Sequence, residues 1–236
     1  MPKSAIVLAA GLGTRMRPLT DQRPKALVEV MGRPLIDYAF DRLAVADASP
    51  VVVNIHHFAD QIEAHLAVRK QPRVILSDER AQLLGTGGGI AKALPALGGA
   101  PFFLLNSDSL WLEKTSNLLR LAQAFDEKRM DALLLLATVE TTVGYDGNGD
   151  YFMDAAGKLR RHVGAGKAPF IYAGAAILAP ALFNGAPKGA FALMPYFDRA
   201  QKNGRLFGLL LEGLFLHVGT PAALAAAEKA IRRAGA

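Results

Sequence analysis

The sequence contains no cysteine. Disulfide bonds and thiolate metal sites are therefore excluded, and the composition fits a reducing compartment. Long apolar runs are absent as well, because the most apolar segments, 5–10 and 131–139, are too short for a signal peptide or a membrane span. We expect a cytoplasmic protein with no membrane partner.

Dense runs of basic residues are also lacking, although the net charge is +6. Such a charge fits either an anionic ligand or a solvated basic surface. The basic residues are not interleaved with aromatic residues, as they are in the stacking platforms that bind nucleic acid. Charged residues make up 20% of the chain, and no segment has the polar bias of a disordered tail. We expect no nucleic-acid partner.

What is present is a large apolar fraction, 51% of 236 residues, arranged in alternating patterns. Short apolar runs predict buried strands at 5–10, 50–55, 73–77, 101–106 and 131–139. Helical spacing lies between them at 34–46, 58–69 and 115–129, the last with Thr115 or Ser116 as its cap. This alternation predicts an α/β fold with a mostly parallel mixed sheet and helices on both faces.

The pattern changes after the fifth predicted strand. Residues 140–180 are rich in Gly, Asp and Tyr and contain three strand-like pieces, at 150–154, 158–163 and 170–178. The last part predicts a helix at 193–203, two strands at 206–211 and 214–218, and a helix at 221–233. No repeat or linker divides the chain, so we expect one domain.

The first strand leads into "LAAGLGTRMRPLT", residues 8–20. A dinucleotide fingerprint would need glycine where Met16 stands, and the Gly-Lys-Ser/Thr of a P-loop is absent. Gly11 and Gly13 nevertheless permit positive φ and close backbone approach, and successive N–H groups can cradle an anion. Arg15 and Lys25 add positive charge behind the same strand. These residues alone fit either a phosphate site or an ordinary turn with solvated basic side chains.

The stretch "LAAGLGTRMRPLT…PKALVEVMGRPLIDY" closely resembles the signature of sugar-1-phosphate nucleotidyltransferases, G-x-G-T-R-[LM]-x-P-L-T followed by P-K. "LGTGGGI" (84–90), "LLNSD" (104–108) and "VGTPAAL" (218–224) extend the resemblance over nearly the whole chain, in order and spacing. In its short length, triple glycine and lack of an added C-terminal domain, the chain is most similar to the family members that act in peptidoglycan recycling and join UTP to N-acetylmuramic acid 1-phosphate.

The resemblance implies a Rossmann-like, GT-A-like nucleotidyltransferase fold in one domain, 1–236. Its nucleotide-binding part would be about 1–110, its sugar-binding part about 111–220, and its C-terminal helix about 221–233. The implied substrates are a nucleoside triphosphate and a sugar 1-phosphate, and the products are a nucleotide sugar and pyrophosphate. Guanylyl transfer to mannose or heptose 1-phosphate, thymidylyl or uridylyl transfer to glucose 1-phosphate, and a regulatory nucleotide-binding protein without turnover remain alternatives. The sequence sets no oligomeric state.

The resemblance also implies the site residues. Arg15 and Lys25 match the catalytic residues that neutralise phosphate charge. The residues implied for nucleotide binding are Ala9, Ala10, Gly11, Gly13, Thr14, Arg15, Gln82, Gly87 and Asn106. The candidates for sugar binding, each with a structural alternative as a turn or core residue, are Asn54, Asp150, Tyr172 and Gly174.

Two residues are implied as metal ligands. Asp108 follows an apolar strand and offers a hard oxygen to Mg²⁺, the alternative being a turn or helix-capping aspartate. His217 stands where the family usually carries the aspartate of D-V-G-T. We expect His217 to bind the metal and, because imidazole replaces a carboxylate, to favour Mn²⁺ or Co²⁺ over Mg²⁺. The alternative is that His217 only hydrogen-bonds a neighbour.

Overall fold

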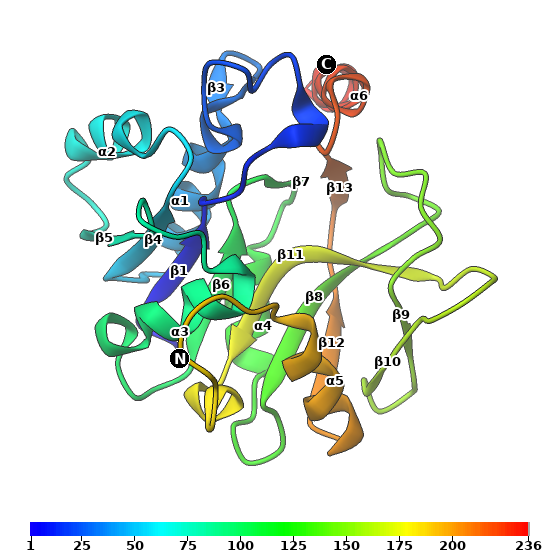
Figure 1. Ribbon diagram of the computed structural model, residues 1–236. Coiled ribbons are helices and arrows are strands. Elements are labelled where there is room, and N and C mark those ends of the chain that lie inside the picture. The colour runs from blue at the N-terminus through cyan, green and yellow to red at the C-terminus, as the bar shows by residue number, and fades with distance from the viewer. Residues whose placement is uncertain (236) are drawn as a thin grey trace.

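The computed structural model describes residues 1–235, and its centre is a nine-stranded sheet (Figure 1). Its strands are β1 (Ala5–Leu8), β4 (Val51–Ile55), β5 (Val74–Asp78), β6 (Phe102–Asn106), β8 (Ala132–Thr138), β9 (Tyr151–Met153), β10 (Leu159–Arg161), β11 (Phe170–Leu178) and β12 (Leu206–Leu210). The main order is β5-β4-β1-β6-β11-β8-β12, with β9 and β10 continuing from one end of β11. β11 runs antiparallel to β6 and β8, whereas β1 is parallel to β4 and β6. The predicted mostly parallel mixed sheet is confirmed.

β1 occupies the position that creates a crevice. It pairs with β4 on one side and with β6 on the other, so the chain after β1 first builds the sheet in one direction and later in the opposite one. Ligands of open α/β sheets bind outside the carboxyl ends of the strands at such a switch point. The turn after β1 therefore lies where a ligand is expected.

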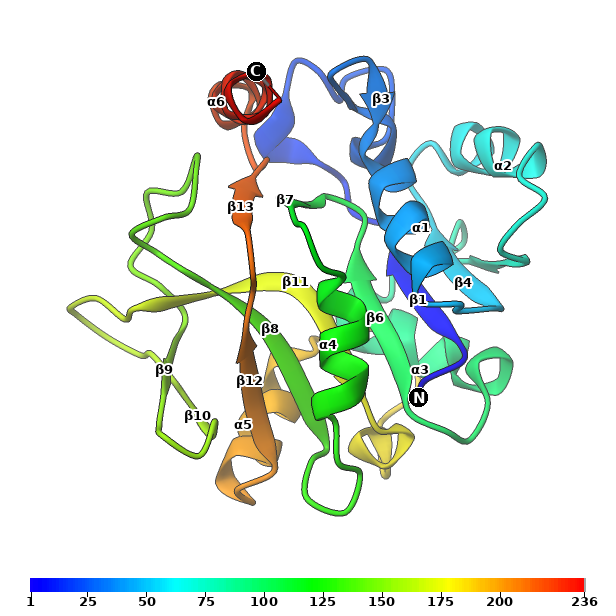
Figure 2. The ribbon, with the colours of Figure 1, turned by 180° about the vertical axis from the view of Figure 1, so that it is seen from behind.

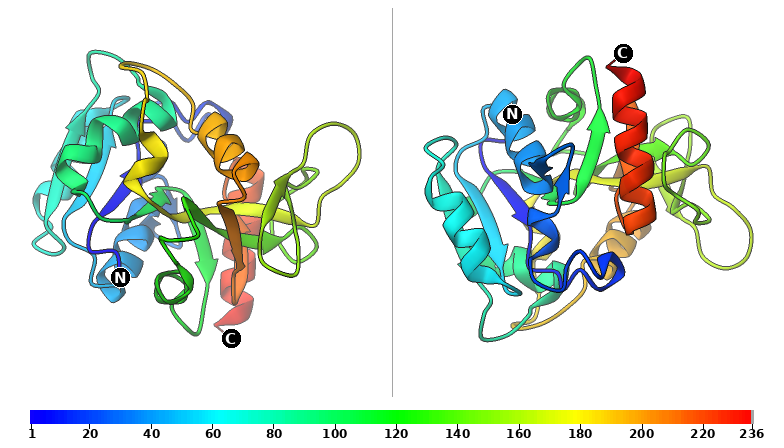
Figure 3. Two further views of the ribbon diagram at one scale, coloured as in Figure 1. Left: turned by 90° about the horizontal axis from the view of Figure 1, so that it is seen from below. Right: turned by 90° about the horizontal axis from the view of Figure 1, so that it is seen from above.

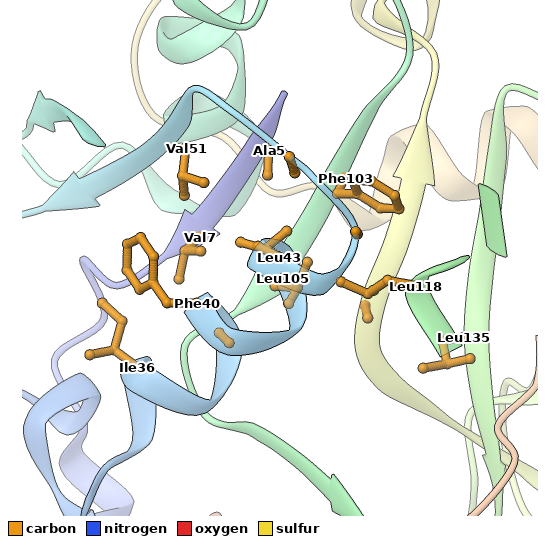
Figure 4. Close-up of a cluster of buried hydrophobic side chains, with 14 of the residues drawn as sticks. Ala5, Val7, Ile36, Phe40, Leu43, Val51, Phe103, Leu105, Leu118 and Leu135 are labelled. Atoms are coloured by element: carbon orange, nitrogen blue, oxygen red, sulfur yellow. The ribbon is translucent and has the colours of Figure 1, made fainter. Parts of the chain in front are cut away.

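Helices cover both faces of the sheet, as predicted (Figures 2 and 3). The helices α1 (Leu35–Val45), α2 (Ala59–Ala67) and α4 (Asn117–Ala124) pack on one face, and α3 (Gly85–Leu97) and α5 (Met194–Lys202) on the other. Alternating side chains of β1 explain this division, because Ala5 and Val7 join the first core and Ile6 joins the second. Figure 4 shows the first core, where Val7 lies beside Phe40.

A third, smaller core lies under the last helix, α6 (Pro221–Ala234). It contains two short strand pairs, β2 (Glu29–Val30) with β3 (Arg33–Pro34) and β7 (Ser109–Leu112) with β13 (Leu214–His217). Met16, which replaces the third glycine of a dinucleotide fingerprint, is fully buried there together with Leu216 and Val218. The turn after β1 is thus anchored to the strand that carries His217. Among residues 1–235, no helix has the length and apolar character needed to cross a membrane.

Two helices differ from what the sequence pattern predicts. The helix expected at 115–129 ends at Ala124, because Phe125 is extended and Asp126 starts a separate turn. Its cap is Ser116, whose hydroxyl accepts the Leu119 N–H at 3.3 Å. The glycine-rich segment "GTGGG", for which the sequence pattern predicts no helix, is the first part of α3.

The glycines of α3 make room for neighbouring chain. A Cβ on Gly87 would lie 2.5 Å from the Phe191 ring, and a Cβ on Gly88 would lie 2.4 Å from the Gly189 carbonyl oxygen. The Phe191 carbonyl accepts the N–H groups of both Gly87 and Gly88. The close approach therefore gives the helix start hydrogen-bond partners that its own turn does not provide. This packing outweighs the low helix propensity of glycine.

We predict that Gly88→Ala destabilises the protein. Alanine gains about 1 kcal/mol of helix propensity, but a new Cβ would press on a backbone carbonyl that has little freedom to move. We expect a net loss of about 1–2 kcal/mol, or roughly 2–8 °C in Tm, measured by calorimetry. Gly99→Ala is the control, since no atom lies within 4 Å of its Cβ position. An unchanged or raised Tm for Gly88→Ala would contradict the prediction.

Candidate active site

A cavity of about 530 Å³ opens at the carboxyl ends of β1, β4 and β6. Most of its wall is the turn after β1, and the opposite wall is the segment that leads into α3. The lining residues are Leu8, Ala9, Ala10, Gly11, Leu12, Gly13, Thr14, Arg15, Met16, Lys25, Asn54, Leu83, Gly85, Thr86, Asn106, Ser107 and Asp108. All the residues predicted from the first motif are therefore together in one cavity.

The turn after β1 is held in shape by specific contacts. The Ala9 N–H donates to the Asn54 side-chain oxygen at 2.8 Å, which ends the strand two residues before the predicted boundary. Gly13 has φ +65°, and a Cβ there would lie 3.1 Å from Thr20, whose hydroxyl donates to the Gly13 carbonyl. Gly11 does not have positive φ, and its Cβ position is open. Glycine is thus required by the backbone at position 13.

Positive and negative charge meet on the cavity wall. The Lys25 ammonium forms an ion pair with the Asp108 carboxylate, and their side chains are 15% and 31% exposed. Arg15 is exposed, lines the same cavity and, within residues 1–235, has no ion-pair partner. The cavity therefore presents one uncompensated guanidinium and a lysine whose partner is the predicted metal ligand. A phosphate group is the natural ligand for such an arrangement.

Two residues predicted to contact the nucleotide lie elsewhere. Gln82 is exposed and does not line the cavity, and Gly87 is buried against Phe191. Leu83 and Thr86 line the cavity instead. The motif "LGTGGGI" located this wall correctly. Which of its residues face the cavity, however, depends on a helix that the sequence pattern did not indicate.

The predicted sugar-binding residues do not form one group. Asn54 lines the cavity, but its amide is engaged with Ala9 and with Glu79. Gly174 (φ +74°) lies against Asn106 and Ser109, where β11 has an irregular register. Neither position offers a free side chain to the cavity.

Tyr172 and Asp150 lie outside the cavity lining. The Tyr172 hydroxyl is buried and has no hydrogen-bond partner among residues 1–235, and burial raises its pKa. Its backbone N–H donates to the Asp150 carboxylate at 2.8 Å. Burial raises the pKa of Asp150 above its usual value, although that hydrogen bond and nearby His217 both act to lower it.

His217 lies on β13, opposite the residue that follows the predicted metal ligand. It pairs with Ser109 in the antiparallel β7–β13 pair, so the side chains of His217 and Ser109 emerge on the same face. His217 does not line the cavity that Asp108 lines. Its Nδ1 lies 3.1 Å from the Gly144 carbonyl oxygen, and its ring packs edge-on against Tyr145. Because a carbonyl only accepts, Nδ1 carries a proton, and in the neutral tautomer the lone pair is therefore on Nε2.

Among the residues that the structure describes, no group of three or more His, Cys, Asp and Glu side chains could hold a metal ion by itself. The carboxylate of Asp108 is nevertheless a hard oxygen donor on the cavity wall. This donor suits a hard divalent cation that also binds phosphate oxygens.

A glycine-containing turn at a switch point, with an arginine, a lysine and an aspartate in one cavity, is typical of nucleotide-binding α/β transferases. The chain belongs to the MobA-like NTP transferase domain family, whose model matches residues 5–192. The predicted membership of the nucleotidyltransferases is confirmed.

Comparisons with individual proteins agree with this family. The chain is 47% identical to the N-acetylmuramate alpha-1-phosphate uridylyltransferase of Caulobacter vibrioides, over 99% of this chain and 98% of the relative. It is 34% identical to the enzyme of the same name from Neisseria meningitidis serogroup B, over 95% and 96% of the two chains. Its fold matches that of UDP-glucose pyrophosphorylase complexed with UDP-glucose, with a TM-score of 0.80, 17% identity and coverage of 99% and 100%.

We predict that Asp150→Asn stabilises the protein at neutral pH. A carboxyl whose folded pKa is raised contributes stability below its unfolded pKa of 3.8, and that contribution is lost as the pH rises through the folded pKa. The amide keeps an acceptor for the Tyr172 N–H and carries no buried charge. The Tm of the variant should exceed that of the wild type by a margin that grows between pH 4.5 and pH 7.5. A margin that is constant or shrinks with pH would refute this.

Proposed function

We propose that this protein transfers a uridylyl group from UTP to N-acetylmuramate α-1-phosphate, releasing pyrophosphate and forming a UDP-sugar for cell-wall recycling. The observation that carries the proposal is the 47% identity, over almost the full length of both chains, to an enzyme of that name. The cavity at the end of β1 supports it, because Arg15, Lys25 and Asp108 lie together there. Guanylyl or thymidylyl transfer has no comparable support over the whole chain.

In the proposed reaction, an oxygen of the sugar phosphate attacks the α-phosphorus of UTP. The new bond joins that oxygen to the α-phosphorus, and the bond from the α-phosphorus to the bridging oxygen of pyrophosphate breaks. No carbon–hydrogen bond is cleaved, so catalysis consists of positioning and charge neutralisation. Arg15 would bind the phosphates that become pyrophosphate, and Lys25 would bind the α-phosphate and the sugar phosphate.

We assign Asp108 and His217 as the protein ligands of a divalent cation. A bound cation would neutralise charge on the phosphates during transfer. The donation of His217 Nδ1–H to the Gly144 carbonyl supports this role, since ligating histidines commonly donate their other nitrogen to a carbonyl. Lys25, released from Asp108, would then be free to meet phosphate.

The sugar is proposed to bind beyond Asp108, toward Asp150. The half-buried carboxylate of Asp150 retains acceptor capacity for sugar hydroxyl groups, because the Tyr172 N–H uses only one of its oxygens. Under this proposal, Asp150→Asn trades activity for the stability gain predicted above.

The proposal is tested by a pyrophosphate-release screen that crosses UTP, GTP, dTTP, CTP and ATP with a panel of sugar 1-phosphates. N-acetylmuramate α-1-phosphate with UTP should give the highest kcat/KM. A preference of tenfold or more for GTP with a mannose- or heptose-type phosphate would overturn the substrate assignment.

Arg15→Ala and Lys25→Ala should each lower kcat/KM without unfolding the protein. Each loses a charge-assisted contact to phosphate, which costs on the order of 2–4 kcal/mol, or about 30- to 1,000-fold. Steady-state kinetics and circular dichroism measure the two effects. Arg17→Ala is the matched control, since Arg17 is exposed, pairs with Asp21 and does not line the cavity. Wild-type kinetics for Arg15→Ala would remove its proposed role.

His217→Asp should shift the metal preference. The imidazole nitrogen favours Mn²⁺ and Co²⁺ over Mg²⁺ more than a carboxylate does. The ratio of kcat/KM with Mn²⁺ to that with Mg²⁺ should therefore fall in the variant. His162→Asn, in the 158–168 segment, is the control and should leave the ratio unchanged. If His217→Asp also leaves it unchanged, His217 only hydrogen-bonds Gly144.

A further inference from the structure

Glu79 is a buried carboxylate that none of the roles above uses. It follows β5 directly, and only 1% of the residue is exposed. Burying a carboxylate is costly unless hydrogen bonds replace its water. Its partners therefore indicate what the residue does.

The Glu79 carboxylate joins the two walls of the cavity. Oε1 accepts the Asn54 side-chain amide at 2.8 Å, and Oε2 accepts the Leu84 backbone N–H at 2.9 Å. On the far side of Asn54, its amide oxygen accepts the Ala9 N–H at 2.8 Å. Ala9 belongs to the turn after β1, and Leu84 lies between the lining residues 83 and 85.

The orientation of Asn54 is determined by its neighbours. The Ala9 N–H only donates, so it must face the amide oxygen, and the amide NH₂ must then face the acceptor-only carboxylate of Glu79. No other arrangement satisfies all three groups. The donor and the acceptor are thus uniquely defined for each hydrogen bond in the series from Ala9 through Asn54 and Glu79 to Leu84.

The third glycine of "TGGG", Gly89, makes room for this series of hydrogen bonds. A Cβ on Gly89 would lie 2.7 Å from the Glu79 carboxylate and 2.8 Å from the Asn54 amide nitrogen. Any side chain at this position of α3 would displace one of them. The glycine therefore belongs to the same arrangement as Glu79 and Asn54.

We propose that Glu79 is a positioning residue for the nucleotide. Through Asn54 it holds the backbone of the turn after β1, and through Leu84 it holds the start of α3, so the spacing of the two cavity walls depends on its carboxylate. Asn54 accordingly acts on the nucleotide side and not as a sugar ligand. The identity of the nucleotide as UTP rests on the function proposed above, but the wall spacing does not.

Glu79→Gln tests this role, because glutamine offers one acceptor and one donor where two acceptors are needed. Its NH₂ would face either the Asn54 NH₂ or the Leu84 N–H. A buried donor left without an acceptor corresponds to a loss of roughly 5- to 150-fold. We expect the Kd for UTP, measured by calorimetry without sugar phosphate, and the KM for UTP to rise by that factor, while the KM for the sugar phosphate changes less than threefold.

The sharpest test exchanges the two polar groups. Asn54→Asp alone would bring two carboxylates together and should weaken UTP binding. Asn54→Asp combined with Glu79→Gln restores every contact with reversed polarity. The new carboxylate accepts from Ala9 and from the new amide, whose oxygen accepts from Leu84. The net charge is unchanged, and the Kd for UTP should return to within about threefold of the wild type, a coupling that double-mutant cycles detect.

Asp37→Asn is the control for a purely structural loss. Asp37 joins α1 to α2 by accepting from Arg69 and His65, and it does not line the cavity. It should lower Tm without changing the Kd for UTP. Two outcomes would overturn the proposal: Glu79→Gln that lowers Tm but leaves the Kd within twofold, or a double variant that binds UTP no better than Asn54→Asp. If Glu79→Gln does not fold, the second comparison decides.

Failure of the proposed function gives a different result. If the wild-type protein binds GTP or dTTP in preference to UTP, the substrate assignment fails. The same variants are then measured with the preferred nucleotide, and the Kd for that nucleotide tests the Glu79 proposal by the same two comparisons. Because the binding measurement needs no turnover, it does not depend on the sugar.

Discussion

The placement of β1 between β4 and β6 is the constraint on which the site depends. Each neighbour is parallel to β1, so all three strands deliver their carboxyl ends to the same edge of the sheet. β1 leads into the turn that is proposed to bind phosphate, β4 contributes Asn54, and β6 leads to Asp108. Because the strands are buried on both faces, a one-residue shift in register would move their side chains from one core into the other, and the relative positions of these three segments are fixed by hydrophobic packing.

Charged side chains on the cavity wall determine which ligand charges the cavity can accept. Lys25 and Asp108 each carry a charge into a partly buried wall, and their ion pair compensates both in the ligand-free protein. Arg15 has no such compensation among the residues described and stays exposed. The cavity is therefore neutral where a cation and a sugar phosphate are proposed to meet, and positive where pyrophosphate is proposed to form. A ligand that brings both a metal and phosphate would replace one ion pair with two new ones.

Local patterns predicted the parts of this molecule that local forces determine. The strands at β1, β4, β5, β6 and β8 were located because each is a short apolar run, and the first turn was located because Gly13 and Arg15 follow such a run. The pairing of β7 with β13 joins segments about 100 residues apart, and the helix α3 begins with four glycines in five positions. Neither has a local signal, since both are stabilised by contacts with distant segments. The hydrogen bond between Ala9 and the Asn54 side chain likewise becomes visible only when β4 lies beside β1.

The triple glycine shows how a motif can describe packing and not ligand contact. Gly87 accommodates the Phe191 ring, Gly88 the Gly189 carbonyl and Gly89 the Asn54–Glu79 pair. Each glycine thus meets a different part of the chain, and only Gly85 and Thr86, which precede them, line the cavity. Because a helix presents successive residues about 100° apart, three adjacent glycines clear a broad sector of its surface. The start of α3 can then pack simultaneously on the loop before α5 and on the Asn54–Glu79 pair next to the turn after β1. This cavity wall packs closely against the rest of the chain because the opposite side of the same helix turn has no side chains.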